Sequence, residues 1–149
     1  MKLKVYKIRD NAKMPVRAHP TDAGMDLFFC PENNQSRNIY SGKTELFPTG
    51  LKISVPNNHM LEIKNKSGVA YKKQLVVGAC VVDNGYDGEV FVNLHNIGTD
   101  VQVLEPGQKI AQAVLVPIVT PELEEINEDN IYGAETERGD GGFGSTGLY

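Results

Sequence analysis

With 149 residues, the chain is long enough to bury a hydrophobic core and corresponds to one domain by length. Its formal net charge of −4 is unevenly distributed, because residues 122–140 hold eight acidic residues against one basic residue, Arg138, and so leave the rest of the chain at +3. This distribution excludes the clustered basic surface of a duplex-binding protein, and we expect no nucleic-acid partner.

The cysteines and histidines do not point to a disulfide framework or a metal site. Cys30 and Cys80 lie in apolar runs without the spacing of a zinc site, so we expect reduced thiols in the core. The three histidines are equally scattered. Residues 1–5 lack the apolar stretch of a signal peptide, and no run approaches the roughly 18 apolar residues that span a bilayer. We therefore expect a cytoplasmic protein with no membrane contact.

Most of the chain is predicted to form short strands. Residues 3–8 alternate apolar residues with lysines, which is typical of an edge strand. Further strands are predicted over residues 25–30, 44–55 with a break at 48–50, 60–65, 101–104 and 109–118. Residues 31–42 are polar and rich in turn-forming residues, which predicts a surface loop. Many short strands with almost no helix predict an all-β sandwich or jelly roll.

Residues 65–73 form the one segment with helical character. Ser67 could cap the helix, and Lys72 and Lys73 suit its last turn. A helix N-terminus with Ser67 and Gly68, beside Lys66, can bind an anion because its free N–H groups and dipole favour negative charge. A simple capped turn explains the same residues, so both interpretations stay open here.

The chain is organised around residues 77–94, which resemble a β-hairpin. An apolar run ends at Asp83, and the Asn84-Gly85 pair that follows tolerates the positive φ of a tight turn. The hairpin would hold the Asp83 carboxylate rigidly at a strand end, with the Tyr86 ring three residues further on. Asp-Asn-Gly is also ordinary turn chemistry, so this stretch alone does not assign a catalytic role.

Two polar residues interrupt otherwise apolar strands. A buried carboxylate needs partners or loses its charge, so Asp26 either faces water, which we expect from the strand alone, or has a function. Gln112 lies within an apolar run, where its amide either bonds to a neighbouring backbone or reaches a ligand.

The glycine-rich end of the chain is the clearest indication of ligand binding. Five glycines within residues 139–147 cannot fold stably alone, so we expect a flexible arm unless a ligand orders it. Arg138 and the hydroxyls of Ser145 and Thr146 could hold a phosphate, while Phe143 stacks on a planar base. The arm therefore predicts binding of a nucleotide-like anion.

Five segments together resemble the homotrimeric dUTPase family, the deoxyuridine 5′-triphosphate nucleotidohydrolases. They are Ala23–Leu27, Lys66–Ala70, Val82–Glu89, Gly107–Gln112 and Arg138–Gly147. The resemblance covers residues 15–147 and implies a distorted jelly roll of the β-clip type. It also implies a homotrimer that exchanges its C-terminal arms, with a body at 1–121, an acidic linker at 122–137 and the arm at 138–149.

The resemblance implies hydrolysis of dUTP to dUMP and pyrophosphate, with Asp83 deprotonating the water that attacks the α-phosphorus. It implies Mg²⁺ bound mostly by the phosphates, with Asp26 acting through water. Tyr86 would lie under the deoxyribose and reject a 2′-hydroxyl. The nucleotide-binding residues implied are Lys66, Ser67, Gly68 and Gln112 for the phosphates, the backbone of Val77, Cys80, Val81 and Val82 for uracil, and Arg138, Phe143, Gly144, Ser145 and Thr146 in the arm.

Three positions depart from the family pattern, and two other functions stay open. Lys66 replaces a common Arg, Cys80 a usual Gly, and Asp87 a frequent basic residue. A dCTP deaminase-like enzyme of the same fold would use a glutamate at the cytosine ring, and a dUTPase-like regulator would bind without catalysis. Asp83 and the complete arm favour the hydrolase over both.

Overall fold

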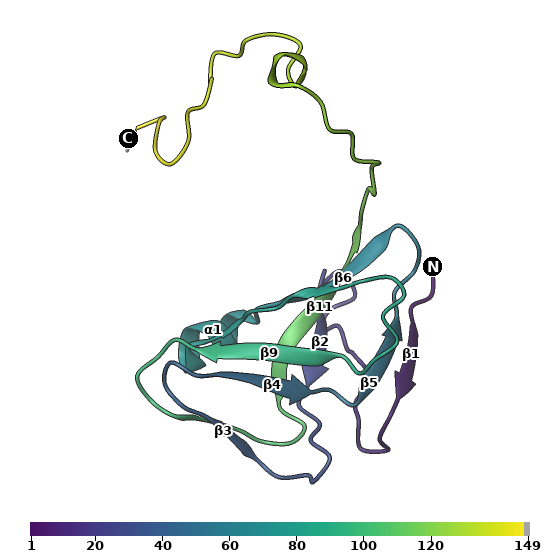
Figure 1. Cartoon of the computed structure of the whole chain (residues 1–149). Helices are drawn as coiled ribbons and strands as arrows, with labels where there is room; N and C mark the ends of the chain where they lie inside the picture. The colour runs from purple at the N-terminus through teal and green to yellow at the C-terminus, as the bar shows by residue number, and fades with distance from the viewer. Residues whose placement is uncertain (148–149) are drawn as a thin grey trace. The chain divides into compact units, whose positions relative to one another are not determined.

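The computed structural model describes residues 1–147, and two residues of the predicted arm, 148 and 149, lie outside them. Contacts within the chain divide it into two compact units, Met1–Val119 and Thr120–Tyr149. We call the first unit the body and describe each unit by itself (Figure 1).

The body consists almost entirely of short strands (Figure 1). Their bounds are β1 (Lys4–Lys7), β2 (Met25–Phe28), β3 (Arg37–Ile39), β4 (Thr44–Pro48), β5 (Leu51–Ser54), β6 (His59–Lys64), β7 (Leu75–Val77), β8 (Val81–Val82), β9 (Phe91–Asn96), β10 (Gln102–Leu104) and β11 (Lys109–Pro117), with one helix, α1 (Ser67–Lys73). None of the helices in residues 1–147 has the length and apolar character needed to cross a bilayer.

The strands pair antiparallel in two main sheets and two ribbons. One sheet has the order β2-β11-β6-β8 and the other β4-β9-β7, while β1 pairs with β5 and β3 with β10. Alternate residues of β5 and β9 are buried, as period-two apolar alternation predicts. The core includes Phe29 and Phe47, whose rings pack edge to face with their centroids 5.2 Å apart. The predicted all-β jelly roll is confirmed.

The predicted hairpin at residues 77–94 is wrong in its pairing. Val77 of β7 lies opposite Leu94 of β9, but β8 leaves β9 and pairs with β6 of the other sheet. Gly78 still lies against β9, where a Cβ atom would be 2.0 Å from Nε2 of His95, so only glycine lets the backbone pass this close. Beyond Ala79 the chain crosses to β6, and the apolar run therefore divides into two strands.

The helix is confirmed, but its cap differs from the prediction. The N-cap residue is Lys66, and no side chain caps the helix, so Ser67 is the first helical residue. Gln74 ends α1 in the left-handed conformation with φ 53°. The predicted loop at residues 31–42 contains β3, which pairs with β10.

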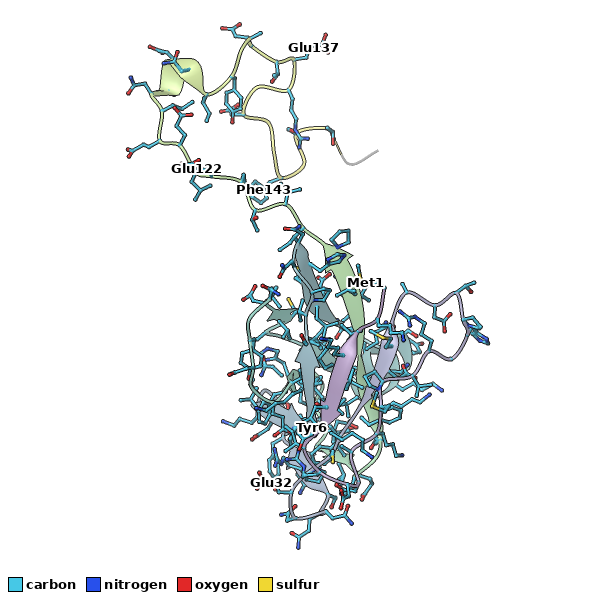
Figure 2. The ribbon with its side chains drawn as sticks, turned by 90° about the vertical axis from the view of Figure 1, so that its right-hand side faces the viewer. Met1, Tyr6, Glu32, Glu122, Glu137 and Phe143 are labelled. Atoms are coloured by element: carbon cyan, nitrogen blue, oxygen red, sulfur yellow. The ribbon has the colours of Figure 1, made fainter. Side chains whose placement is uncertain are left out.

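The second unit contains a single short 3₁₀ helix, η1 (Glu128–Asn130), and a series of turns. Figure 2 shows its side chains, with Glu122, Glu137 and Phe143 labelled, along a single chain trace. In the glycine-rich part, the Arg138 Nε atom donates to the Gly141 carbonyl at 2.9 Å, and Phe143 is fully exposed.

Candidate active site

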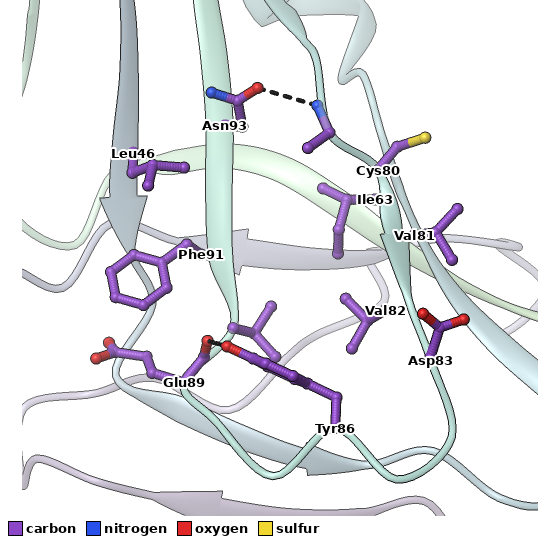
Figure 3. Close-up of a pocket in the computed structure, with 12 residues that line it drawn as sticks. Leu46, Ile63, Cys80, Val81, Val82, Asp83, Tyr86, Glu89, Phe91 and Asn93 are labelled. Carbon is purple, nitrogen blue, oxygen red and sulfur yellow. Dashed lines mark hydrogen bonds between the residues drawn. The ribbon is translucent and has the colours of Figure 1, made fainter.

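A pocket of 280 Å³ opens where β8 ends and the chain turns (Figure 3). Cys80, Val81 and Val82 form one side, and Phe91 and Asn93 of β9 form the other. Asp83 and Tyr86 also line the pocket, so the structure brings together most of the residues predicted from the central stretch. Val77 is not among the lining residues, because it lies in β7 and its N–H donates to Asn65 Oδ1 at 2.7 Å.

A tight turn holds Asp83 at the pocket edge. The Tyr86 N–H donates to the Asp83 carbonyl at 3.2 Å, and Gly85 adopts the φ of +90° that such a turn needs. The Asn84 side chain donates to the Val55 carbonyl at 2.6 Å and fixes the turn to the end of β5. The Asp83 carboxylate is exposed and has no hydrogen-bond partner within residues 1–147, so its oxygens are open to hydrogen bonds from water.

The Tyr86 ring lies across the pocket beside the turn (Figure 3). Its hydroxyl donates to the backbone carbonyl of Glu89 at 2.9 Å. A Cβ atom at Gly88 would lie 2.3 Å from that hydroxyl oxygen, so the ring packs directly on the glycine backbone. One hydrogen bond and one glycine therefore fix the ring in place.

Asn93 organises the far side of the pocket and was not identified from the sequence. Its side-chain oxygen accepts from the Ala79 N–H at 2.9 Å, and its backbone carbonyl accepts from the Gly78 N–H at 3.0 Å (Figure 3). The Cys80 carbonyl accepts from Ile63, whereas the Cys80 N–H has no partner within residues 1–147. Cys30 is a free thiol in the core, as expected, whereas the free thiol of Cys80 is half-buried and lies outside the core, contrary to the expectation.

Asp26 does not face water, which corrects the expectation from the strand alone. Its side chain is 7% exposed and forms ion pairs with Lys66 and, at 2.7 Å, with Lys109. Burial alone would raise the pKa of Asp26, but the hydrogen bonds from Lys109 and Lys66 outweigh it and lower the pKa below its ordinary value. Asp26 therefore stays charged at neutral pH, and one of its two cations, Lys109, is a residue that the sequence did not single out.

Gln112 connects three of the predicted segments. It lies opposite Asp26 of β2 and Lys64 of β6, and its side-chain Nε2 donates to the Asn65 carbonyl at 2.8 Å. Gly24 packs against it so closely that a Cβ there would meet Gln112 Oε1 at 1.9 Å. Of the two interpretations open for Gln112, the structure supports a bond to a neighbouring backbone, and the residue as a whole is half-buried.

The site residues of the body fall into two groups at different positions along β6. The pocket group meets β6 at Ile63, which lines the pocket and donates its N–H to the Cys80 carbonyl, and the cation group of Asp26, Lys66, Lys109 and Gln112 adjoins Lys64. These two β6 positions are neighbours in the strand, and the side chains of neighbouring strand residues point to opposite faces of a sheet. Within residues 1–147, no hydrogen bond or ion pair joins one group to the other. The predicted arm residues Arg138, Phe143, Gly144, Ser145 and Thr146 belong to the second unit.

Comparison with known proteins gives a consistent result along the whole chain. The family model of dUTPase matches residues 10–147. The deoxyuridine 5′-triphosphate nucleotidohydrolase of Gloeothece citriformis is 40% identical over 99% of this chain and 98% of its own length. That of Arabidopsis thaliana is also 40% identical, over 97% of this chain and 82% of its own.

Solved structures show the same relationship. The dUTPase of Staphylococcus bacteriophage 80alpha, solved with dUPNHPP, has a TM-score of 0.88 and 29% identity, with 99% of each chain covered. The dUTPase from phage phi11 of S. aureus, in a structure describing the coordination of a structural Mg(II) ion, has a TM-score of 0.78 and 27% identity over 86% of this chain and 98% of its own. By sequence and by fold, this chain belongs to the dUTPase family.

Proposed function

We propose that this protein hydrolyses dUTP to dUMP and pyrophosphate. The observation that carries the proposal is the Asp83 carboxylate, exposed and without a partner within residues 1–147, at the edge of a pocket shared with Tyr86. In a chain of the dUTPase family, that arrangement supports a general base beside a nucleoside site.

In the proposed reaction, Asp83 accepts a proton from a water molecule as the water oxygen attacks the α-phosphorus. The new P–O bond forms as the bond to the bridging oxygen breaks, and pyrophosphate leaves with those electrons. A positioned base contributes a factor of roughly 10² to 10⁴ in rate. The turn holds Asp83 firmly enough for this role because Asn84 fixes it to the end of β5.

The pocket between Cys80 and Asn93 would bind the nucleoside. Uracil needs a donor for its carbonyl oxygens, and the Cys80 N–H is an amide of this stretch without a partner inside residues 1–147. The other predicted uracil contacts, from the Val81 and Val82 backbone, lie on the same side of the pocket. The deoxyribose would rest on the Tyr86 ring, which would leave no room for a 2′-hydroxyl.

Lys66, Ser67, Gly68 and Gln112 would bind the triphosphate, with Lys109 adding a second cation beside Lys66. Asp26 holds both ammonium groups on its two oxygens, so the lysines are fixed while the cluster keeps a net positive charge. Lys66 would meet the phosphates as a point charge, whereas an Arg at this position would offer a planar, two-pronged guanidinium group.

The residues present fit an Mg²⁺ ion bound mainly by the substrate. Within residues 1–147, no three His, Cys, Asp or Glu side chains lie close enough to hold a metal. A carboxylate has about four lone-pair positions, and the two lysines use two of those on Asp26. Asp26 could therefore hold a metal-bound water while the phosphates supply the direct ligands. When bound, Mg²⁺ would make the α-phosphorus more electrophilic.

We also propose that the active form is a homotrimer in which arms are exchanged. The arm residues belong to a unit separate from the body, which supports a site completed by the arm of another subunit. The arm, residues 138–149 beyond an acidic linker at 122–137, would close over the nucleotide. Arg138 and the Ser145 and Thr146 hydroxyls would meet the terminal phosphates, while Phe143 and Gly144 would lie over uracil.

Product analysis tests the substrate and the reaction together. The purified protein is incubated with Mg²⁺ and, separately, with dUTP, dCTP, dTTP and UTP, and the products are separated by chromatography. Formation of dUMP and pyrophosphate from dUTP alone is the expected result. Deamination of dCTP would establish the deaminase-like alternative instead, and absence of any turnover would indicate a binding or regulatory protein.

A further inference from the structure

A largely buried ion pair joins the N-terminal part of the body to the end of the turn that carries Asp83 and Tyr86. The side chains of Arg9 and Glu89 are 15% and 14% exposed. Arg9 Nη2 donates to Glu89 Oε1 and also to the Cys30 carbonyl at 2.8 Å. The hydrogen bond that Arg9 donates to Glu89 raises the pKa of Arg9 above its ordinary value, so the guanidinium stays charged.

The Glu89 side chain is fixed from a second direction. Its Oε1 atom also accepts from the Gly50 N–H at 2.7 Å, at the break between β4 and β5. The next residue, Val90, donates its N–H to the Leu51 carbonyl at 2.8 Å. The backbone of Glu89 is thus held both by its own side chain and by its neighbour.

The same backbone carries the hydrogen bond that orients Tyr86. The Tyr86 hydroxyl donates to the Glu89 carbonyl, and the Glu89 side chain extends from the same residue away from the ring (Figure 3). The contacts therefore form a chain from the Arg9 guanidinium through the Glu89 carboxylate and carbonyl to the Tyr86 hydroxyl. Removing one partner of a buried ion pair leaves the other charge buried without a partner, so the test must separate the effect of this pair on geometry from its effect on stability.

We propose that Arg9 and Glu89 are positioning residues that hold the Tyr86 ring and so set discrimination between deoxyribo- and ribonucleoside triphosphates. The proposal rests on the proposed function, in which the ring lies under the sugar. A closely packed ring excludes a 2′-hydroxyl only while it cannot move. Loss of the ion pair would let the Glu89 carbonyl and the ring shift, and UTP would then be accepted more readily.

The test measures the ratio of kcat/KM for dUTP to kcat/KM for UTP. Steric rejection of an added hydroxyl is worth a factor of about 10², so Arg9→Met should lower the ratio by about tenfold. Arg9→Lys should lower it less, because it keeps the charge but loses the fork that reaches both Glu89 and Cys30. Leu104→Val, a change in the core at β10, controls for general loss of stability because Leu104 lies opposite Arg37 of β3 and takes no part in the hydrogen bonds of the pair.

A double-variant comparison separates positioning from simple destabilisation. Tyr86→Phe removes the hydroxyl through which Arg9 and Glu89 hold the ring. Adding Arg9→Met to Tyr86→Phe should therefore not lower the dUTP-to-UTP ratio of kcat/KM any further. Should Arg9→Met not fold, Glu89→Gln carries the same test, since its amide oxygen can still accept from Gly50.

Three outcomes would overturn the inference: an unchanged ratio in folded Arg9→Met or Glu89→Gln, fully multiplicative effects in the double variant, or an equal fall in Leu104→Val. If the proposed function is wrong, the wild-type protein itself will not hydrolyse dUTP. That result is distinct from the three above, and it would also overturn this inference.

Discussion

Replacing Gly24 by alanine should damage the phosphate end of the site without changing any residue that touches substrate. The new Cβ would lie 1.9 Å from Gln112 Oε1 and 3.1 Å from Gln112 Cβ. Rotating the amide alone does not relieve the second contact, so β2 and β11 must also move apart slightly. The Gln112 bond to the Asn65 carbonyl, at 2.8 Å, would be lost.

Two magnitudes follow from this geometry. Overpacking of this kind costs about 1 to 3 kcal/mol of unfolding free energy, which is a fall in Tm of about 2 to 12 °C for a chain of this size. A hydrogen bond to a charged phosphate is worth about 1.5 to 3 kcal/mol, so misplacement of Gln112 should raise KM for dUTP about 10- to 150-fold. Gly133→Ala is the matched control, because a Cβ there meets nothing within 4 Å.

The assay combines thermal unfolding with steady-state kinetics on dUTP. Adding Gln112→Ala to Gly24→Ala should restore stability, because the clash is removed, while KM stays high. Gly24→Ala with the Tm and KM of the wild-type protein would refute the reasoning. So would a double variant that recovers the wild-type KM, since Gln112 would then make no contact with the phosphates.

Three further predictions concern charge and the arm. Asp83→Asn should lower kcat by about 10² to 10⁴ with unchanged Tm, and a wild-type rate in stopped-flow or product assays would exclude Asp83 as the base. Because the folded pKa of Asp26 is lowered, its contribution to stability is present above its unfolded pKa of about 3.9 and lost as pH falls through the folded pKa. Denaturant unfolding should accordingly show Asp26→Asn less stable than wild type at pH 7, with the gap closing below about pH 4; a pH-independent gap would contradict the ion-pair assignment. Deleting residues 138–149 should abolish efficient turnover while residues 1–119 keep their fold, and unchanged kcat/KM would exclude closure by the arm.

Much of the fold could be predicted from the sequence because strands, turns and helix ends depend on short-range patterns of residue types. Alternation along β9, the break between β4 and β5, and the helix ending at Lys73 all depend on residues within a few positions of one another. The hairpin prediction failed for a non-local reason. Asn93 holds the chain to β9 as far as Ala79, and the next residue, Cys80, accepts from Ile63 of β6 instead. Neither Asn93 nor Ile63 is near these residues in sequence.

The sequence by itself determined the family, the strand-rich fold and the identity of the residues at the candidate base and the arm, since these depend on residue types in a fixed order. Only the tertiary structure decided what surrounds them. Asp26 is buried because β2 pairs with β11 and thereby brings Lys109 to its carboxylate, while α1 begins beside it with Lys66. Glu89 is held by Arg9, which is 80 residues away in the sequence. Strand pairing brings together charged residues that are far apart in the sequence, and their attraction is stronger in the buried interior than in water. Neither effect can be predicted from a local sequence pattern.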